Sequence, residues 1–332
     1  MKMIKASTVA LAGLLLTATA SAEERITAVH AFSPTLIYTQ SFLEFVDKLN
    51  ARGEGVIQID VRGGPEAIGL AEQPDAVRNG VVDMAYTAAS FYAGALPERD
   101  AMIASNSNAA HARATGGLDL MAQIHQEKMG VHYLGWFDSG VSYNLYMVNT
   151  PTLDADGNLD VSDVRLRSNP VYDAFFTDFL GARIISIATP EVYSALERNV
   201  VDATGWTQVG LKNLGWNEFL NYRIEPSFYS TDMGVIINLD TWEGLSEEAR
   251  SILQEVAIEH EISSSESFRA LIDDQMAELE ADGMQVVRLE GEAAQRYIDG
   301  AQAASWNRMR TQMENHPMGL THYDALLELF NE

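Results

Sequence analysis

Apolar residues recur along this chain in two alternating rhythms. Short runs rich in Val and Ile, typical of buried strands, are separated by stretches whose apolar residues recur every three or four positions, as in amphipathic helices. The first set of predicted strands covers residues 26–32, 56–61 and 81–87, with helices at 36–49 and 72–79 between them. The same order returns at 164–167, 183–187 and 200–204, with helices at 171–180 and 190–198. The pattern predicts an α/β chain built from two related βαβαβ units.

Two segments that align with each other support this internal repeat. Residues 76–83 and 195–202 each predict the end of a helix followed by a strand that stops at an aspartate, Asp83 or Asp202. Gly80 and Asn199 occupy the same place in the two segments, where a helix commonly ends in a left-handed residue. Ligands of open α/β sheets bind beyond the carboxyl ends of the strands, so we expect binding residues to follow these two aspartates.

Residues 246–282 contain no Gly or Pro and predict a long helix that begins after Ser246 as its N-cap. As one helix this segment would measure about 55 Å, at roughly 1.5 Å per residue. Its apolar stripes at 249–256 and 268–279 are separated by a polar stretch, so a single helix would serve two hydrophobic cores. The alternative is two helices with a break near residues 263–265.

The composition limits the classes of function. Of the 332 residues, 47% are apolar, which is enough for about two domains. The formal charge of −25 repels nucleic acids and anionic membranes, so neither is an expected partner. Because the chain has no Cys, it has no disulfide, no thiolate zinc site and no cysteine nucleophile.

The first residues predict export. Lys2 and Lys5 precede an apolar stretch at 6–20 that is too short for a stable membrane span, and residues 20–22 form an A-x-A cleavage signature. We therefore expect a signal peptide over residues 1–22 and a periplasmic mature chain that does not insert into the membrane. An uncleaved N-terminal anchor is the alternative.

Several motifs together resemble one known family. They lie at 164–170, 180–182, 190–198 and 201–202, with further matches at 33–34, 63–66 and 80–83. The chain resembles the DctP-type solute-binding proteins of tripartite ATP-independent periplasmic (TRAP) transporters. The resemblance implies a two-lobed periplasmic binding protein, type II-like, that closes around an organic acid and delivers it to TRAP membrane subunits. It also implies a long helix that spans both lobes, and a protein that is not an enzyme.

The order of the elements then suggests the boundaries of the lobes. We expect the first lobe to comprise residues 24–142 plus 233–268, and the second to comprise residues 143–232 plus 269–332.

Arg167 is the first candidate for the ligand site. The resemblance places it at the end of a strand that faces the cleft, where a guanidinium can bind a carboxylate through two charge-assisted hydrogen bonds. Arg165, two positions earlier, is expected to form an ordinary surface ion pair.

Most of the remaining candidates come from the same resemblance, whereas Tyr92 is proposed as one of the aromatic residues that follow strand ends, with packing in the core as the alternative. Trp206 and Gln208 follow Asp202, and Tyr92 follows the strand that begins near residue 81. Glu66 and Gln73 would either orient ligand hydroxyls or cap the next helix. The expected ligand-binding residues are Arg167, Trp206, Gln73, Glu66, Tyr92, Asn169, Ser33 and Gln208.

The sequence also departs from the family. Gly205 stands where the members that bind 2-oxo acids with a metal cation carry a Glu, so no metal and no other cofactor is expected here. A second arginine found in sialic-acid-binding members is missing, with residues 143–146 in its place. The sequence contains no H-E-x-x-H zinc motif, no G-x-S-x-G elbow and no P-loop. The remaining alternative is an exported hydrolase or lyase that uses Glu66 or Asp83.

Overall fold

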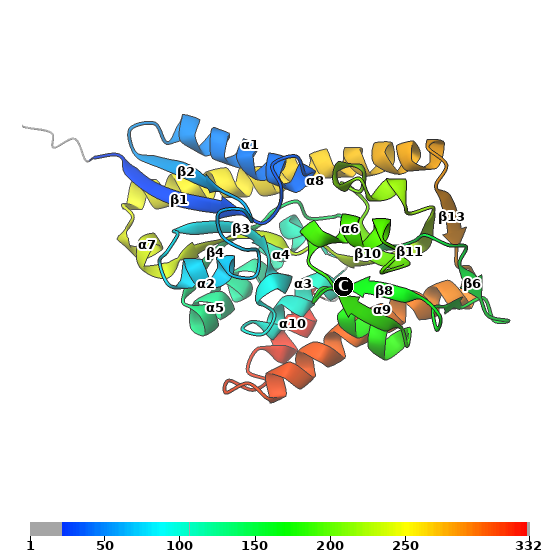
Figure 1. Cartoon of the computed structure of the whole chain (residues 1–332). Coiled ribbons are helices and arrows are strands. Elements are labelled where there is room, and N and C mark those ends of the chain that lie inside the picture. Colours follow the sequence, from blue (N-terminus) through cyan, green and yellow to red (C-terminus); the bar gives the residue numbers. More distant parts are fainter. Residues whose placement is uncertain (1–21, 106, 331–332) are drawn as a thin grey trace, which may run out of the picture.

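The computed structural model describes residues 22–105 and 107–330. The predicted signal peptide, apart from its last residue, lies outside this range. The described chain forms two mixed β-sheets, each with helices packed against it (Figure 1). The α/β class and the two-unit organisation predicted from the sequence are confirmed.

The first sheet contains the N-terminal unit. Its strand order is β2-β1-β3-β12-β4. In that order the strands are Ile57–Gly63, Glu24–His30, Met84–Ala88, Met233–Asn238 and Val131–Trp136. β1 pairs in parallel with both β2 and β3, while β12 runs antiparallel to its neighbours β3 and β4.

The second sheet repeats this arrangement. Its strand order is β13-β11-β5-β10-β8-β9, formed by Gln285–Arg288, Tyr222–Ser230, Ser142–Met147, Ala203–Thr207, Arg165–Ser168 and Arg183–Ser186. β8 pairs in parallel with β9 and β10, as β1 does with β2 and β3. The strand that follows in space, β5, runs antiparallel to β10. The two units therefore share a topology and not only a sequence rhythm.

The helices complete the two units. They are α1 (Ile37–Arg52), α2 (Gln73–Arg78), α3 (Asp100–Ala104), α4 (Ala109–Thr115), α5 (Gly117–Met129), α6 (Val192–Glu197), α7 (Leu239–Gly244), α8 (Glu247–Ala281), α9 (Gly291–Glu314) and α10 (Tyr323–Phe330). The helix predicted at 171–180 is present but shorter: residues 173–174 are α-helical and continue into the π-helical segment η3 (Phe175–Phe179). Short 3-10 turns include η1 (Ala89–Tyr92), η2 (Pro97–Arg99) and η4 (Thr189–Glu191), and Thr152–Leu153 pairs with Leu159–Asp160 as β6 and β7.

α8 is one continuous helix, as the sequence predicted. Ser246 caps it by accepting a hydrogen bond from the backbone N–H of Ala249 at 3.1 Å. Its N-terminal half packs against α1 and β4 of the first unit. Further along, the Gln275 side chain accepts a hydrogen bond from Gly210 N, and Glu280 pairs with Arg223 of β11. Figure 1 shows this helix, coloured yellow to orange, running past both sheets.

The expected strand ends at Asp83 and Asp202 are wrong, because each aspartate precedes its strand. Gly80 and Asn199 do adopt the predicted left-handed conformation, with φ of 68° and 53°. The carboxylate of Asp83 accepts hydrogen bonds from the backbone and hydroxyl of Thr27 on β1, and Asp202 binds Arg165 on β8 in the same way. Each aspartate thus ties the start of one strand to its parallel neighbour.

In the described chain, strands of the two sheets are connected by three segments: the link from β4 to β5, the link from β11 to β12, and the segment with α8 that leads from β12 to β13. Asp138 lies in the first link with a φ of 54° and is fully buried. Its carboxylate accepts hydrogen bonds from Ser41 at 2.6 Å and from Tyr86, and its backbone N–H donates to Ser264 of α8. Burial raises the pKa of this carboxyl to about 6. Asp138 therefore joins the first link to α1, β3 and α8.

The expected second lobe includes residues 269–332, but not all of this C-terminal segment packs with it. The first half of α9 packs with the second sheet through Tyr297 and Ala301, but Trp306 and Met309 lie in the core of the first. α10 contacts α3, α4 and α5. We therefore propose that the first lobe also includes residues 323–330, because the apolar face of α10 is buried there.

Candidate functional site

A cavity of about 550 Å³ lies between segments of the two lobes. The first lobe contributes residues 65–72 in part, together with Phe91 of η1. The second contributes Arg167 and Asn169 at the end of β8, and residues 186–191 after β9. These segments follow the carboxyl ends of β2, β3, β8 and β9, where an α/β sheet is expected to bind its ligand.

Arg167 is the only cation among the described residues that line this cavity. Its side chain is held in place on several sides. The Nε–H donates to the carbonyl of Ile187 at 2.9 Å, and Nη2 donates to the Thr189 hydroxyl at 3.3 Å. Nη1 donates to the Tyr172 hydroxyl. The indole of Trp216 lies with its centroid 5.8 Å from the guanidinium carbon.

Within the described chain, no carboxylate forms an ion pair with Arg167, and its side chain is wholly shielded from bulk water. A buried guanidinium without an acidic partner is unfavourable by several kcal/mol. The three bonds above use three of its five N–H groups, which leaves one on each terminal nitrogen. A carboxylate that accepts both would supply the missing negative charge with bidentate geometry.

The position of the Tyr172 ring gives a structural reason for a glycine at position 205. The Tyr172 hydroxyl accepts from Arg167 and donates to the carbonyl of Gly205 at 2.8 Å. A Cβ at position 205 would lie 2.8 Å from Cε1 of the Tyr172 ring, which is too close for any side chain. The glycine therefore makes room for the tyrosine that orients Arg167, a role that the sequence alone did not suggest.

Asn169 also lines the cavity, and its side-chain amide nitrogen is available as a donor. Its side-chain oxygen accepts from the backbone N–H of Val171 at 2.9 Å, whereas its amide nitrogen has no partner among the described residues and can donate to a ligand. The next residue, Pro170, is fixed through its carbonyl, which accepts from Arg99 at 3.1 Å and from Arg308 at 2.8 Å. Arg99 belongs to the first lobe, so this turn also bridges the lobes.

Three predicted residues make hydrogen bonds within the protein and do not line the cavity. Trp206 is buried, packs edge-on against Phe32 and Trp216, and donates from its indole to Val209 O at 3.0 Å. Gln208 exchanges hydrogen bonds with Ser142 at the start of β5. Gln73 donates to the carbonyls of His30 and Ile68, and thereby holds the loop before α2.

The other predicted residues lie elsewhere. Glu66 is exposed and accepts from Gly64 N at 2.7 Å, a bond that lowers the pKa of its carboxyl. Ser33 is exposed and bonds to Thr35. Tyr92 points into the first-lobe core, where its hydroxyl lies 2.9 Å from Nε2 of His125. Its neighbour Phe91 lines the cavity instead, because successive residues of the η1 turn face different directions.

The enzyme alternative finds no support in this geometry. Both oxygens of Asp83 accept hydrogen bonds, from Thr27 and from Thr241, which gives this carboxylate a structural role. Glu66 has a lowered pKa and stays ionised, so it is poorly suited to donate a proton. Within residues 22–105 and 107–330, no group of three or more His, Cys, Asp or Glu side chains is arranged to hold a metal ion.

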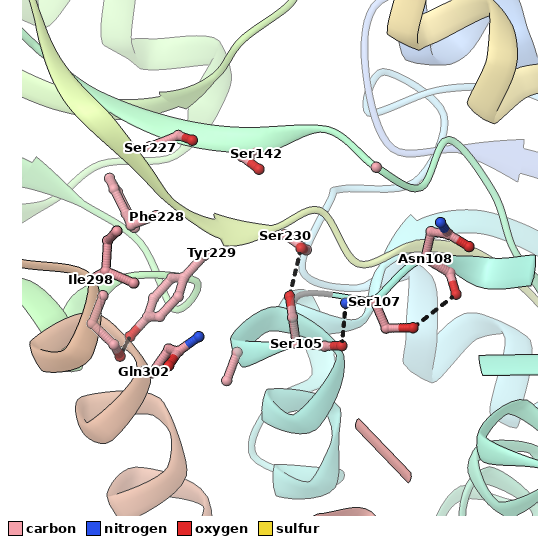
Figure 2. Close-up of a pocket in the computed structure, with 13 residues that line it drawn as sticks. Ser105, Ser107, Asn108, Ser142, Ser227, Phe228, Tyr229, Ser230, Ile298 and Gln302 are labelled. Atoms are coloured by element: carbon pink, nitrogen blue, oxygen red, sulfur yellow. Dashed lines mark hydrogen bonds between the residues drawn. The ribbon is translucent and has the colours of Figure 1, made fainter. Parts of the chain in front are cut away.

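A second, smaller pocket of about 280 Å³ lies between the loop after α3, the strands β5 and β11, and α9. Figure 2 shows that hydroxyl groups gather here, with Ser230 bonded to the carbonyl of Ser105 and Tyr229 lying beside Ile298 and Gln302. None of the described residues that line it is charged. It offers no cation for a carboxylate, so the Arg167 cavity, which lies beyond the carboxyl ends of strands from both sheets, is the better candidate site.

Comparison with known proteins identifies a family and relatives of similar sequence. The model of the family described as DctP, bacterial extracellular solute-binding protein, family 7, matches residues 28–312. A C4-dicarboxylate-binding periplasmic protein from Rhodobacter capsulatus is 25% identical over 237 residues, which is 69% of each chain. A monocarboxylate 2-oxoacid-binding periplasmic protein from Nostoc is 25% identical over 111 residues, 32% of this chain and 30% of that protein.

Solved structures share the fold. An extracytoplasmic solute receptor from Bordetella pertussis that binds pyroglutamic acid superposes with a TM-score of 0.74 at 19% identity, covering 92% of this chain and 99% of that one. A TRAP transporter solute-binding protein from Bordetella bronchiseptica, described with copurified calcium and picolinate, gives 0.78 at 20% identity, covering 93% and 92%.

Proposed function

We propose, on the premise that this chain belongs to bacterial extracellular solute-binding protein family 7, that it is the extracytoplasmic receptor of a TRAP transporter. It captures an organic acid between its lobes, with Arg167 as the anchor of the carboxylate. It then delivers the ligand to membrane subunits. Membership of a solute-binding family makes the chain a receptor and not an enzyme.

One observation carries the proposal most strongly. Arg167 is buried, oriented by Ile187, Thr189 and Tyr172, and lacks an acidic partner in the described chain. An arrangement of this kind is suited to an anion that arrives from outside. Most ligands named for similar proteins carry a carboxylate, among them a C4-dicarboxylate, 2-oxo acids, pyroglutamate and picolinate, although one similar structure holds sn-glycerol-3-phosphate.

The proposed function includes a periplasmic location for the mature chain. The family is extracellular, and the sequence at residues 1–22 predicts a signal peptide that is cleaved to release the chain into the periplasm. No helix in the described part of the chain combines the length and apolar character that crossing a membrane requires. The membrane subunits are therefore expected to be separate chains.

The test compares Arg167→Lys with Arg165→Lys. Lysine keeps the charge at position 167 but removes the paired donors, so affinity for a bound carboxylate should fall about 10- to 150-fold, corresponding to roughly 1.5–3 kcal/mol. Arg165 is half-exposed and paired with Asp202, so Arg165→Lys is a matched control that should bind like the parent.

Calorimetry with succinate, 2-oxoisovalerate, pyroglutamate, gluconate and 3-phenylpropionate supplies the affinities, and thermal melts confirm that each variant is folded. If Arg167→Lys binds the preferred carboxylate as tightly as the parent, the anchor lies elsewhere and the proposal fails.

A further inference from the structure

The cavity that holds Arg167 is otherwise largely apolar. Phe91 and Leu70 face it from the first lobe, and Ile187 faces it from the second. All three are only partly buried, although each is large and apolar. Phe91 is held edge-on against Phe32, with ring centroids 6.1 Å apart. Partly exposed apolar side chains that converge from two lobes form a surface suited to an apolar ligand body.

The charges around the cavity favour a ligand with a single carboxylate. Arg167 is the one cation among the described lining residues, and its two free N–H groups match one carboxylate. The other charged lining residues are Glu72 and Glu191, which lie exposed, one on each lobe. A second carboxylate on the ligand would find no cation in this lining and would meet repulsion from these acids.

The lining also has few groups for ligand hydroxyls. Its neutral polar side chains are Asn169, Ser186 and Thr189. Thr189 already accepts a bond from Arg167, and Asn169 uses its oxygen for the backbone of Val171. A polyhydroxylated acid would lose hydrogen bonds to water on entry and regain few of them, which lowers its affinity.

We infer that the ligand is a monocarboxylate with an apolar, branched or aromatic body, and that the site discriminates against dicarboxylates and sugar acids. This inference rests on the proposed function, since it takes Arg167 as the carboxylate anchor. The carboxylate binds Arg167, and the body packs between Phe91 and Leu70 on one side and Ile187 on the other.

The first experiment measures Kd by calorimetry for 4-methylpentanoate and 3-phenylpropionate against succinate and gluconate. At least one of the apolar monocarboxylates should bind about tenfold or more tightly than both polar acids, a difference of about 1.4 kcal/mol. Tighter, Arg167-dependent binding of succinate or gluconate overturns the inference and leaves the proposed function standing. If none of these four acids binds, and none of the acids named under the proposed function binds either, the proposed function fails. The inference then fails as well.

Two variants then test the mechanism of selectivity. Phe91→Ala removes one apolar wall and should weaken 3-phenylpropionate about tenfold while changing acetate little, because acetate has no body to contact it. Glu72→Gln combined with Glu191→Gln removes the two acids and should raise the affinity for succinate several-fold more than the affinity for 4-methylpentanoate, because succinate carries twice the negative charge. Equal effects on every acid in either variant contradict the assigned roles.

Discussion

Gly205 lies against the ring of Tyr172, and we predict that Gly205→Ala weakens carboxylate binding by about tenfold or more. The added Cβ would lie 2.8 Å from the ring, so Tyr172 has to shift and its bond to Arg167 is lost or bent. A misplaced guanidinium no longer presents two aligned donors to the ligand. Calorimetry with the carboxylate that the parent binds most tightly measures the effect.

Gly94→Ala is the matched control, because a Cβ at Gly94 meets no atom within 4 Å and its backbone does not need a positive φ. This variant should bind like the parent. If Gly205→Ala also retains parental affinity, Tyr172 does not orient the anchor.

His125 gives a prediction about acid stability. Burial lowers the pKa of this imidazole to about 4, and its neutral form is held between the Met121 carbonyl and the Tyr92 hydroxyl. The unfolded chain, with a histidine pKa near 6.5, binds a proton that the folded chain excludes between about pH 6.5 and 4. Stability is therefore lost as the pH falls through this window, by up to about 3 kcal/mol for this residue.

His125→Gln cannot titrate, so its unfolding free energy should fall less steeply than that of the parent between pH 6.5 and 4. Urea denaturation at several pH values measures both slopes. His260, Asp138 and Glu261 have shifted pKa values as well, but they titrate in both proteins and cancel in the comparison. His132 is coupled to His125, so the comparison is repeated in a His132→Gln background. Parallel curves for the two proteins would show that His125 is not held neutral.

At the scale of single elements, α8 should tolerate no interruption. Glu266 lies exposed near its middle, so Glu266→Pro removes one helical hydrogen bond and clashes with the preceding turn without disturbing a core contact. We expect the unfolding free energy to fall by about 3 kcal/mol or more. Glu266→Ala keeps the helix and should stay within about 0.5 kcal/mol of the parent in the same urea titration. Equal stability of both variants would mean that continuity of the helix contributes little.

Much of the secondary structure could be predicted because it depends on local pattern. The long helix follows from a stretch without Gly or Pro and with a Ser cap, and the left-handed residues follow from their position at helix ends. The starts of β3 and β10 could not be placed, because Asp83 and Asp202 act through hydrogen bonds to neighbouring strands that are distant in sequence. Strand boundaries of this kind depend on tertiary pairing.

In the candidate site, too, some features could be predicted from the sequence, whereas others depend on the fold. Arg167 could be proposed from its motif and its chemistry, but Trp216 and Ile187 reach it only through the fold. Tyr92 was predicted where Phe91 lines the cavity, an error of one position in a turn whose direction the sequence does not reveal. Sequence patterns identify the chemical group, whereas its neighbours depend on how the chain closes.

For the whole molecule, we predict that a bound carboxylate makes the protein more compact. The lobes touch through Tyr38 and Thr207, whose hydroxyls lie 3.0 Å apart, and through the bond from Arg99 to Pro170. Since no part of Arg167 is exposed here, a ligand can reach it only after a rearrangement, and we expect this rearrangement to separate the lobes. Hinge closure should then lower the radius of gyration on ligand binding.

Small-angle X-ray scattering tests this with a saturating carboxylate and with its methyl ester, which cannot form the paired ionic bonds. Only the free acid should cause compaction. An unchanged radius of gyration at saturation would contradict closure of the lobes.

α8 restricts how the lobes can move. The helix is bound to the first lobe by the ion pairs Glu259–Arg52 and Glu261–Arg113. It is bound to the second lobe by the hydrogen bond from Gly210 to Gln275 and by the ion pair Glu280–Arg223. A rod attached at both ends keeps its own flank of the molecule almost constant in shape, while the opposite flank changes as the lobes rotate. We therefore predict that a membrane subunit which binds only the loaded receptor recognises the flank away from α8, where closure of the lobes changes the surface most.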